Sequence, residues 1–377
     1  MSRKTKEEAD LEVEIARSVI QGLPDDKLLA SLEFLNKLKE FKRISKLYDT
    51  YITGVETALR NTKNGRMYVS YKIDGTVTGR LSNSGENVLE GRPDDGKIGV
   101  SFHTLPREQG EFNIRDYVIA PPGHKFITID MKAMELRVLA HVANEKNMIK
   151  AFESGIDLHD YTTEMVFGKK KSEVSEKQWK LDRQDSKEAS FLTVYGGTEN
   201  TLAAKRGITV ARAKKVIDNW MAAYPGVPAY MEYVREYITA NKFIKTIFGR
   251  KRNLPNIASP FKGVRNEAFR QGLNFTVQSP ASDILCCGFI GTYNEFKKKK
   301  MNAKLAATVH DSLEIICPDD EVDEVIRIAY HQLVNYPYMR EKFNLQLKVP
   351  LEIEVEVGTS FGNGKKVDLT SYSLLNH

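Results

Sequence analysis

The sequence has few of the features that mark secreted, membrane-spanning or zinc-binding proteins. Its 377 residues include three cysteines, and Cys286 and Cys287 are adjacent, so the three fit neither a disulfide framework nor a zinc site. No apolar run approaches the roughly 20 residues that a membrane-spanning helix needs. The first residues are charged and contain no apolar stretch, unlike a secretory signal. We therefore expect a protein of a reducing cytoplasm with no membrane partner.

The charge pattern points weakly to a polyanionic partner. Hydrophobic residues make up 41% and charged residues 28% of the chain, which is ordinary for a soluble globular protein. The formal net charge is +6, and one stretch is basic with few acidic residues in it. The basic residues of this stretch are Lys242, Lys245, Arg250, Lys251, Arg252, Lys262, Arg265 and Arg270. A second run, Lys297 to Lys300, is more typical of a solvated helix end.

The hydrophobic periodicity predicts a fold that mixes helices and strands. Apolar residues at spacings of three and four indicate helices over 6–60 and over most of 134–241. The other expected elements are strands at 68–73, 125–129, 304–309, 313–316 and 351–357 and helices at 263–300 and 320–335. A β-containing core is thus interrupted by a helical insertion between about 133 and 265. The predicted fold class is α+β.

Two aspartates stand where predicted strands end. Asp130 follows the strand at 125–129, and Asp311 occupies the turn between two later strands. Two exposed carboxylates held rigidly in this way can bind a pair of divalent cations about 3.5–4 Å apart, which suits in-line phosphoryl displacement. The alternative is structural, with Asp130 capping the next helix and Asp311 only making a turn.

Two polar stripes follow helix faces. Arg183, Lys187, Phe191 and Tyr195 are spaced by four, before Gly196-Gly197, which should end their helix. The two cations suit nucleotide phosphates, and the two rings suit a sugar and a base. The alternative is a surface Arg and Lys beside two core aromatics.

The second stripe has the same spacing of four and consists of Arg270, Asn274 and Gln278. Side chains of this kind can reach the minor-groove acceptors that every base pair offers. Such contacts accept any sequence but test the geometry of the base pair. The alternative for this stripe is an exposed polar helix face.

Taken in order, these segments resemble the motifs of family A DNA polymerases. The stretch from Asp130 to Arg137 is similar to motif A, that from Arg183 to Gly196 to motif B, and that from Val309 to Ser312 to motif C. Four further matches in family order are Thr78-Gly79-Arg80-Leu81-Ser82, Asp157-Leu158-His159, Tyr224-Pro225-Gly226-Val227 and Gly249-Arg250-Lys251-Arg252. Each motif alone is modestly specific, but all of them in the correct order are very specific.

The resemblance implies a right-hand polymerase with an antiparallel palm sheet, helical fingers and a short helical thumb. The implied division is thumb 1–60, palm 61–133 and 265–377, and fingers 134–264. The implied reaction adds deoxynucleotides to a primer 3′-OH under the direction of a template. Its partners are primer-template DNA and dNTPs, and its cofactors are two Mg²⁺ ions, for which Mn²⁺ can substitute.

The resemblance also assigns roles to single residues. Asp130 and Asp311 are the implied metal ligands, helped by the backbone carbonyl of Met131. The residues expected at the triphosphate are Arg183, Lys187 and His159, with Lys187 also a general acid toward pyrophosphate. Glu135 is the expected steric gate against a ribose 2′-OH.

The remaining assignments concern the nucleotide's sugar and base and the DNA. Phe191 is expected to pack on the nucleotide sugar, which implies discrimination against dideoxynucleotides, and Tyr195 is expected beside the templating base. The residues expected to contact the primer terminus and the template minor groove are Arg80, Arg270, Asn274, Gln278 and His310.

Several positions depart from the family pattern. Met131, Lys132 and Ala133 replace the usual Tyr, Ser and Gln of motif A, while the aspartate and glutamate remain. Ser312 replaces the usual glutamate of motif C, which is expected to weaken the organisation of water or metal. Leu192 stands where the fingers helix usually has glycine, and it favours a stiffer helix. The usual L-Q-N segment of the palm is read as Phe102-His103-Thr104.

No acidic exonuclease motif precedes the thumb, so we expect no proofreading by this chain. One interpretation is a naturally split, phage-encoded polymerase that acts in the host cytoplasm beside a separate exonuclease or thumb-completing subunit. Another is a stand-alone enzyme with a shortened thumb and a processivity factor.

Two rival functions were weighed. A single-subunit RNA polymerase shares the hand and the metal chemistry, but Glu135 and the His-Asp of motif C argue against it. A catalytically silent DNA-binding subunit is the rival of another class, and the presence of both aspartates, Arg183 and Lys187 argues against it.

Overall fold

The computed structural model describes residues 25–62, 65–84, 99–106 and 113–373. The chain divides into two compact units, one of residues up to 70 with 84–101, and one of 71–83 with 102–377. No helix within the described ranges is both long enough and apolar enough to cross a membrane.

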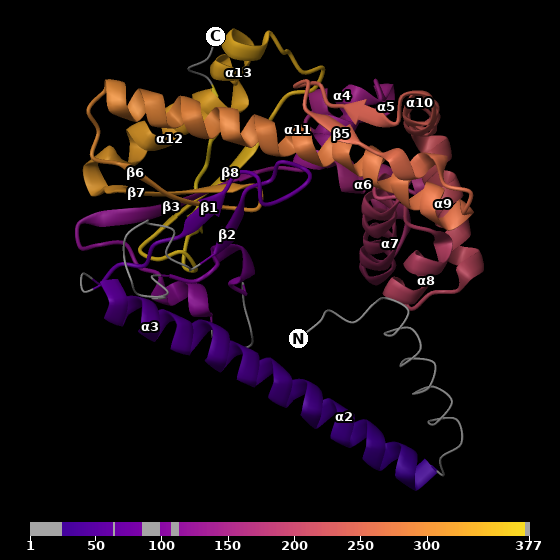
Figure 1. Ribbon diagram of the computed structural model, residues 1–377, viewed down its shortest axis with the longest axis horizontal. Coiled ribbons are helices and arrows are strands. Elements are labelled where there is room, and N and C mark those ends of the chain that lie inside the picture. Colours follow the sequence, from indigo (N-terminus) through magenta and orange to yellow (C-terminus); the bar gives the residue numbers. More distant parts are fainter. Residues whose placement is uncertain (1–24, 63–64, 85–98, 107–112, 374–377) are drawn as a thin grey trace. The chain divides into compact units, whose positions relative to one another are not determined.

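The first unit is a nearly continuous run of helix. It begins with α2 (Asp25–Lys46), passes through the π-helical turn η1 (Leu47–Ile52) and ends with α3 (Thr53–Thr62) (Figure 1). Residues 25–62 are therefore helical as the sequence predicts, whereas 6–24 lie outside the described residues. Gly54 in α3 lies so close to Val100 that an added Cβ would be 3.1 Å from the valine side chain.

The second unit is built on a five-stranded antiparallel sheet with the order β6-β7-β3-β8-β9. Its strands are β3 (His124–Met131), β6 (Lys304–Val309), β7 (Ser312–Pro318), β8 (Ile353–Gly358) and β9 (Lys365–Lys366). The predicted strands at 125–129, 304–309, 313–316 and 351–357 are all confirmed within one to two residues. An antiparallel sheet beside separate helices is the α+β class that the sequence predicts.

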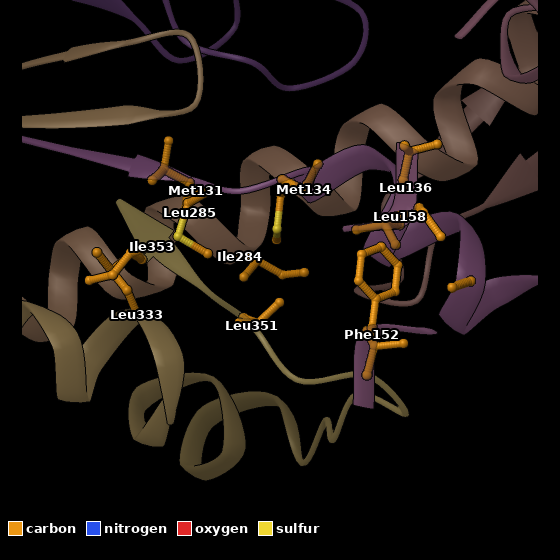
Figure 2. Packing of buried hydrophobic residues seen from close by; sticks show 14 of the residues in the cluster. Met131, Met134, Leu136, Phe152, Leu158, Ile284, Leu285, Leu333, Leu351 and Ile353 are labelled. Carbon is orange, nitrogen blue, oxygen red and sulfur yellow. The ribbon is translucent and has the colours of Figure 1, made fainter. Parts of the chain in front are cut away.

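The two faces of this sheet differ because side chains alternate along a strand. One face carries the fully buried Ile127, Ile129, Leu313, Ile315 and Val355. The long helix α11 (Lys262–Lys298) and α12 (Val322–Val334) contribute to the same core. Figure 2 shows Ile284, Leu285 and Leu333 of these helices beside Met131 and Ile353 of the sheet.

The helical insertion leaves the sheet after β3 and returns through α11 (Figure 1). Its helices are α4 (Met134–Val142), α5 (Lys146–Glu153), α6 (Leu158–Phe167), α7 (Glu176–Val194), α8 (Glu199–Arg206), α9 (Val210–Ala223) and α10 (Gly226–Asn241). Trp220 and Tyr224 of the α9 end are fully buried among them. The predicted insertion between about 133 and 265 is thus present.

Some elements differ from the prediction. The strand expected at 68–73 is only β1 (Ser70–Lys72), which pairs with β2 (Ser82–Ser84). The basic stretch forms an unpredicted hairpin of β4 (Phe243–Lys245) and β5 (Lys251–Asn253). Other short elements are η2 (Phe102–Thr104), η3 (Ile114–Tyr117), η4 (Lys171–Glu173), η5 (Pro255–Ala258), η6 (Asp319–Glu321), α13 (Pro337–Phe343) and α14 (Thr370–Ser373). Short elements carry too few periodic residues to be recognised in a sequence.

Candidate active site

Asp130 and Asp311 lie together at one end of the sheet. Asp130 is near the end of β3, where it pairs with Ser312 of β7. The backbone N–H of Met131 donates a hydrogen bond to the carbonyl of Asp311 at 3.1 Å. Met131 is buried in the core, with 3% of the residue exposed. The structure therefore brings the backbones of the two predicted aspartates close together, although 181 positions separate them in the sequence.

The structural alternatives for the two aspartates have different outcomes. Asp130 does not cap α4, because the residue at the cap position is Ala133 and no side chain caps that helix. Asp311 does lie in the expected two-residue turn, between the paired residues Val309 and Ser312. Its carboxylate, however, also accepts a hydrogen bond from Arg80.

The backbone on both sides of the aspartate pair is strained. Ala133 has a φ of 49° and His310 a φ of 57°, which is the left-handed region that non-glycine residues rarely adopt. His310 adopts it at the first position of the two-residue turn, and Ala133 at the start of α4. Strain of this kind clusters at functional sites, so these two outliers support a functional reading of the region.

Arg80 and Tyr195 connect the aspartates to Glu135. The Arg80 Nη2 atom donates to Glu135 Oε1 at 2.8 Å and to Asp311 Oδ1 at 3.0 Å. The Tyr195 hydroxyl donates to the other oxygen of Glu135. Burial, helped by the charge of Glu135, raises the pKa of Tyr195, which keeps this hydroxyl protonated as a donor. Residues from all three polymerase motifs and from the Thr78–Ser82 segment thus meet at one point.

The α7 residues that are expected to bind the nucleotide take part in a second group of contacts. Arg183 forms ion pairs with Asp157, at 3.1 Å, and with Asp160, two acids at the start of α6. The sequence analysis missed this pairing because the acids are 23 and 26 positions away. Lys187 is exposed one turn further along α7. The ring centroids of His159 and Phe191 are 6.3 Å apart.

His159 is held in its neutral form. Its buried Nδ1 atom has no hydrogen-bond partner. Burial, together with the positive charge of Lys187, lowers the pKa of His159 to about 4. A buried imidazole without a partner is a candidate for a ligand contact, in agreement with its expected place beside a triphosphate.

The second predicted stripe approaches the end of α7. Arg270, Asn274 and Gln278 are half-buried on a part of α11 where most neighbours are buried. Gly196 has a φ of +68°, and a Cβ added there would be 2.4 Å from the Arg270 side chain. The Asn274 Oδ1 atom is buried without a hydrogen-bond partner.

His310 lies beside His103, in the segment that the sequence analysis matched to the L-Q-N segment of the family. The rings of His103 and His310 stack with centroids 5.2 Å apart. His103 Nε2 lies 3.1 Å from the carbonyl of Thr308, and burial lowers the pKa of His103. The segment Phe102–Thr104 therefore lies next to motif C. A cavity of about 380 Å³ adjoins this pair, and its lining includes Arg80, Thr308, Leu285 and Cys286.

Two further departures from the family pattern, Leu192 and Ser312, have defined contacts in the structure. Leu192 packs on Gly197, where an added Cβ would be 2.8 Å from the leucine Cδ2 atom. The backbone N–H of Gly197 also donates to the carbonyl of Leu192 at 2.7 Å. Ser312 is buried and forms hydrogen bonds with Val309 and Glu314. The sequence analysis did not single out Glu314, because nothing local marks a lone glutamate in a strand.

The site can supply part of a coordination sphere for Mg²⁺. Within the described residues, no group of three or more His, Cys, Asp or Glu side chains is placed to hold a metal ion. Two carboxylates at strand ends and one backbone carbonyl are nevertheless hard oxygen donors. Mg²⁺ is usually bound through one or two carboxylates together with substrate phosphates and water. The residues therefore fit a metal that arrives with its nucleotide.

The comparison with known proteins agrees with this geometry. The family model described as DNA polymerase family A matches residues 2–363. The chain belongs to DNA polymerase family A. This assignment confirms the resemblance inferred from the motifs.

Curated relatives of this family A chain are bacterial DNA polymerases I. It is 30% identical over 322 residues to DNA polymerase I of Chloroflexus aurantiacus, which covers 85% of this chain and 31% of the relative. It is 28% identical over 333 residues to the thermostable DNA polymerase I of Thermus aquaticus, which covers 88% of this chain and 36% of the relative. The chain thus spans about a third of the length of these relatives.

A solved structure is similar to most of this family A chain. The POL domain of Pol1 from M. smegmatis, in complex with DNA primer-template and dNTP, matches with a TM-score of 0.76 and 25% identity. The match covers 89% of this chain and 55% of that chain. It confirms the polymerase-domain fold, of which the palm sheet and the helical insertion are the described parts.

Proposed function

We propose that this chain is a template-directed DNA polymerase that adds deoxynucleotides to a primer 3′-OH. The observation that carries the proposal is that Arg80 contacts both Asp311 and Glu135, and Tyr195 contacts Glu135, at the end of the sheet where Asp130 pairs with Ser312. Membership of DNA polymerase family A supports it. The relative from M. smegmatis was solved with primer-template and dNTP, which supports DNA and dNTPs as the partners.

Asp130, Asp311 and the backbone carbonyl of Met131 would hold the Mg²⁺ ions, or Mn²⁺ in their place. When bound, two such ions lower the pKa of an attacking hydroxyl and stabilise the charge of the departing pyrophosphate. The protein's own contribution is geometric, because Asp130 on β3 lies beside the turn that carries Asp311. Lys187 is exposed and would donate a proton to the leaving pyrophosphate.

Arg183, Lys187 and His159 would bind the triphosphate of the incoming nucleotide. Arg183 has a planar guanidinium that suits phosphate oxygens, and it already binds two carboxylates that carry charge of the same sign. Phe191 stands near His159 and would pack on the sugar. Glu135, held from both sides by Arg80 and Tyr195, would exclude a ribose 2′-OH.

The other half of the site would hold the DNA. Arg270, Asn274 and Gln278 share one face of α11 and offer donors to the minor groove. Arg80 and His310 adjoin Asp311 and would contact the primer terminus, while Tyr195 would lie beside the templating base.

The test is primer extension by the purified chain with Mg²⁺, comparing wild type with Asp130→Ala and Asp311→Ala. A matched control is Asp218→Ala, which removes an exposed acid of α9 that forms an ion pair with its helix neighbour Lys214. We expect extension by wild type and the control, and none by the two site variants, with duplex binding retained. Normal extension by Asp311→Ala would contradict the mechanism.

The nucleotide used separates the rival functions. Preference for dNTPs over rNTPs supports a DNA polymerase, whereas preference for rNTPs would support an RNA polymerase. Salt-sensitive duplex binding without any metal-dependent incorporation would support a DNA-binding subunit.

A further inference from the structure

Glu314 is a fully buried acid immediately behind the candidate active site. It lies on β7 and is 0% exposed. Thr128 of β3 is its partner across the sheet, and the next pair toward the active site is Asp130 with Ser312. Side chains two apart on a strand share a face. These four residues therefore share the polar face of the sheet, with Asp130 at its open end and Glu314 at its buried end.

A chain of hydrogen bonds joins these residues to the turn that carries Asp311. Thr128 Oγ1 donates to Glu314 Oε2 at 2.6 Å. Ser312 Oγ lies 2.5 Å from Glu314 Oε1 and 2.8 Å from the carbonyl oxygen of Val309. Thr308 Oγ1 donates to the carbonyl of Ser312 at 2.8 Å. The chain thus ties β3 to both ends of the turn between Val309 and Ser312.

Counting protons favours a neutral Glu314. A serine hydroxyl has one proton, and a carbonyl oxygen can only accept. If Ser312 donates to Val309, the proton in its contact with Glu314 must come from the Glu314 carboxyl. The contacts of Thr128 with Glu314, of Glu314 with Ser312 and of Ser312 with Val309 are satisfied together only when Glu314 is neutral. The alternative, an ionised Glu314, leaves the Val309 carbonyl without this donor.

The surroundings of Glu314 favour the neutral form. Burial is the main cause that raises the pKa of Glu314 to about 7, and the charge of Asp130 acts in the same direction. The hydrogen bonds with Ser312 and Thr128 lower this pKa, and the charge of Arg115 of η3 acts in the same direction as they do. The Arg115 guanidinium lies 4.4 Å over the ring of Phe361 and donates to the carbonyl of Leu105. The other titratable neighbour is Tyr71, whose hydroxyl binds the backbone of Thr308.

We propose that Glu314 is a neutral positioning residue that holds Asp130 and Asp311 at their working separation, in place of the glutamate that Ser312 replaces in motif C. It acts through Ser312 on the turn that carries Asp311, and through Thr128 on the strand that carries Asp130. The inference deepens the proposed function and rests on it, since it assumes that the two aspartates bind the metal ions.

The competing explanation is that Glu314 only satisfies hydrogen bonds inside the sheet. In that case its loss lowers stability but leaves metal binding by the folded protein unchanged. A positioning residue behaves differently, because loss of a partner behind metal ligands typically weakens metal affinity or activity about 10- to 100-fold. Metal dependence measured on folded protein separates the two explanations.

The experiment compares wild type with Glu314→Leu and Glu314→Gln, using Glu356→Gln as the control. Glu356 lies on the same sheet face, opposite Thr128 on β8, but outside the hydrogen-bonded chain. Two quantities are measured at a temperature where all variants are folded. They are the Mg²⁺ concentration for half-maximal primer extension, and Mn²⁺ affinity by electron paramagnetic resonance with primer-template bound.

We expect Glu314→Leu to weaken both quantities about 10-fold or more and the control to leave them unchanged. Glu314→Gln should rescue the loss, because a neutral amide donates to Ser312 and accepts from Thr128 as the neutral carboxyl does. A folded Glu314→Leu protein with wild-type metal dependence would overturn the proposal. Equal damage by Gln and Leu would overturn the neutral state.

Two further outcomes are informative. If Glu314→Leu does not fold, Thr128→Val and Ser312→Ala each remove one link and keep the carboxyl, and unchanged metal dependence in both would overturn the proposal. If wild type itself neither extends primers nor binds Mn²⁺, the proposed function fails and the positioning role fails with it. Extension by wild type with unchanged Glu314 variants refutes the positioning role alone.

Discussion

The guanidinium of Arg80 donates a hydrogen bond to the carboxylate of Asp311 at 3.0 Å, and the same nitrogen donates to Glu135 at 2.8 Å. One nitrogen therefore connects the acid proposed to bind metal with the acid proposed to select the sugar. The backbone next to Arg80 has a close neighbour outside the site. Gly79 packs against the guanidinium of Arg250, and this guanidinium forms an ion pair with Asp283. A change at Arg80 should consequently affect both nucleotide addition and sugar selection.

We expect Arg80→Ala to slow single-turnover dNTP addition about 10-fold or more, since a hydrogen bond between charged groups is worth about 1.5–3 kcal/mol. The ratio of dNTP to rNTP use should fall in parallel, because Glu135 loses one of its two anchors. Rapid-quench primer extension measures both. Arg327→Ala, an exposed arginine of α12 paired with acids of its own helix, is the control. Slower addition with an unchanged sugar preference would show that the hydrogen bond from Arg80 to Glu135 does not contribute to sugar selection.

Asp160 should compete with the triphosphate for Arg183. The two side chains form an ion pair, and binding of phosphate to Arg183 must weaken or share it. We expect Asp160→Asn to lower the KM for dNTP up to about fivefold, because partly exposed ion pairs contribute about 1 kcal/mol or less. Steady-state kinetics with kcat as the internal reference measures this. A higher KM would mean that Asp160 orients Arg183 instead of competing for it.

Nucleotide binding should raise the pKa of His159. In the free protein burial and Lys187 lower this pKa to about 4, so the imidazole is neutral at pH 7. A triphosphate brings negative charge next to it and favours the protonated form. The affinity for dNTP should therefore increase as the pH falls toward the raised pKa. Histidine NMR titration with and without a non-hydrolysable dNTP follows the shift, and an unchanged His159 pKa would place the triphosphate elsewhere.

The Glu314 carboxyl should make the protein less stable as the pH rises. Its pKa is about 7 in the folded protein against an ordinary value of 4.5, so between these values the folded state binds more protons than the unfolded state. Stability is then lost as the pH rises from 4.5 to about 7 and is constant above it. The full shift corresponds to roughly 3 kcal/mol.

Glu314→Gln removes this titration. Its unfolding free energy relative to wild type should therefore rise between pH 4.5 and 7 and then level off, as measured by urea denaturation at several pH values. A difference between the two proteins that does not change with pH would show that Glu314 has an ordinary pKa. Glu356→Gln again serves as the control, because Glu356 shares the sheet face but not the buried chain.

Much of the candidate site could be predicted because its signals are local. The spacing of four in Arg183, Lys187, Phe191 and Tyr195 predicts one helix face, and α7 carries the first three of them and ends just before Tyr195. The turn at His310 and Asp311 is equally local, since two β-rich runs with two residues between them predict a hairpin. Family membership followed from the order of such motifs along the chain.

What the sequence alone determined is therefore the α+β class, the main helices and strands, the family and the residue types of the site. These follow from periodicities of two and four and from short motifs, which depend on neighbours in the chain. Only the tertiary structure decided which partners these residues have. Arg80 binds Asp311 across 231 positions, and Thr128 binds Glu314 across 186. Such contacts depend on strand register and on burial, and no local pattern specifies which distant side chain fills the space opposite.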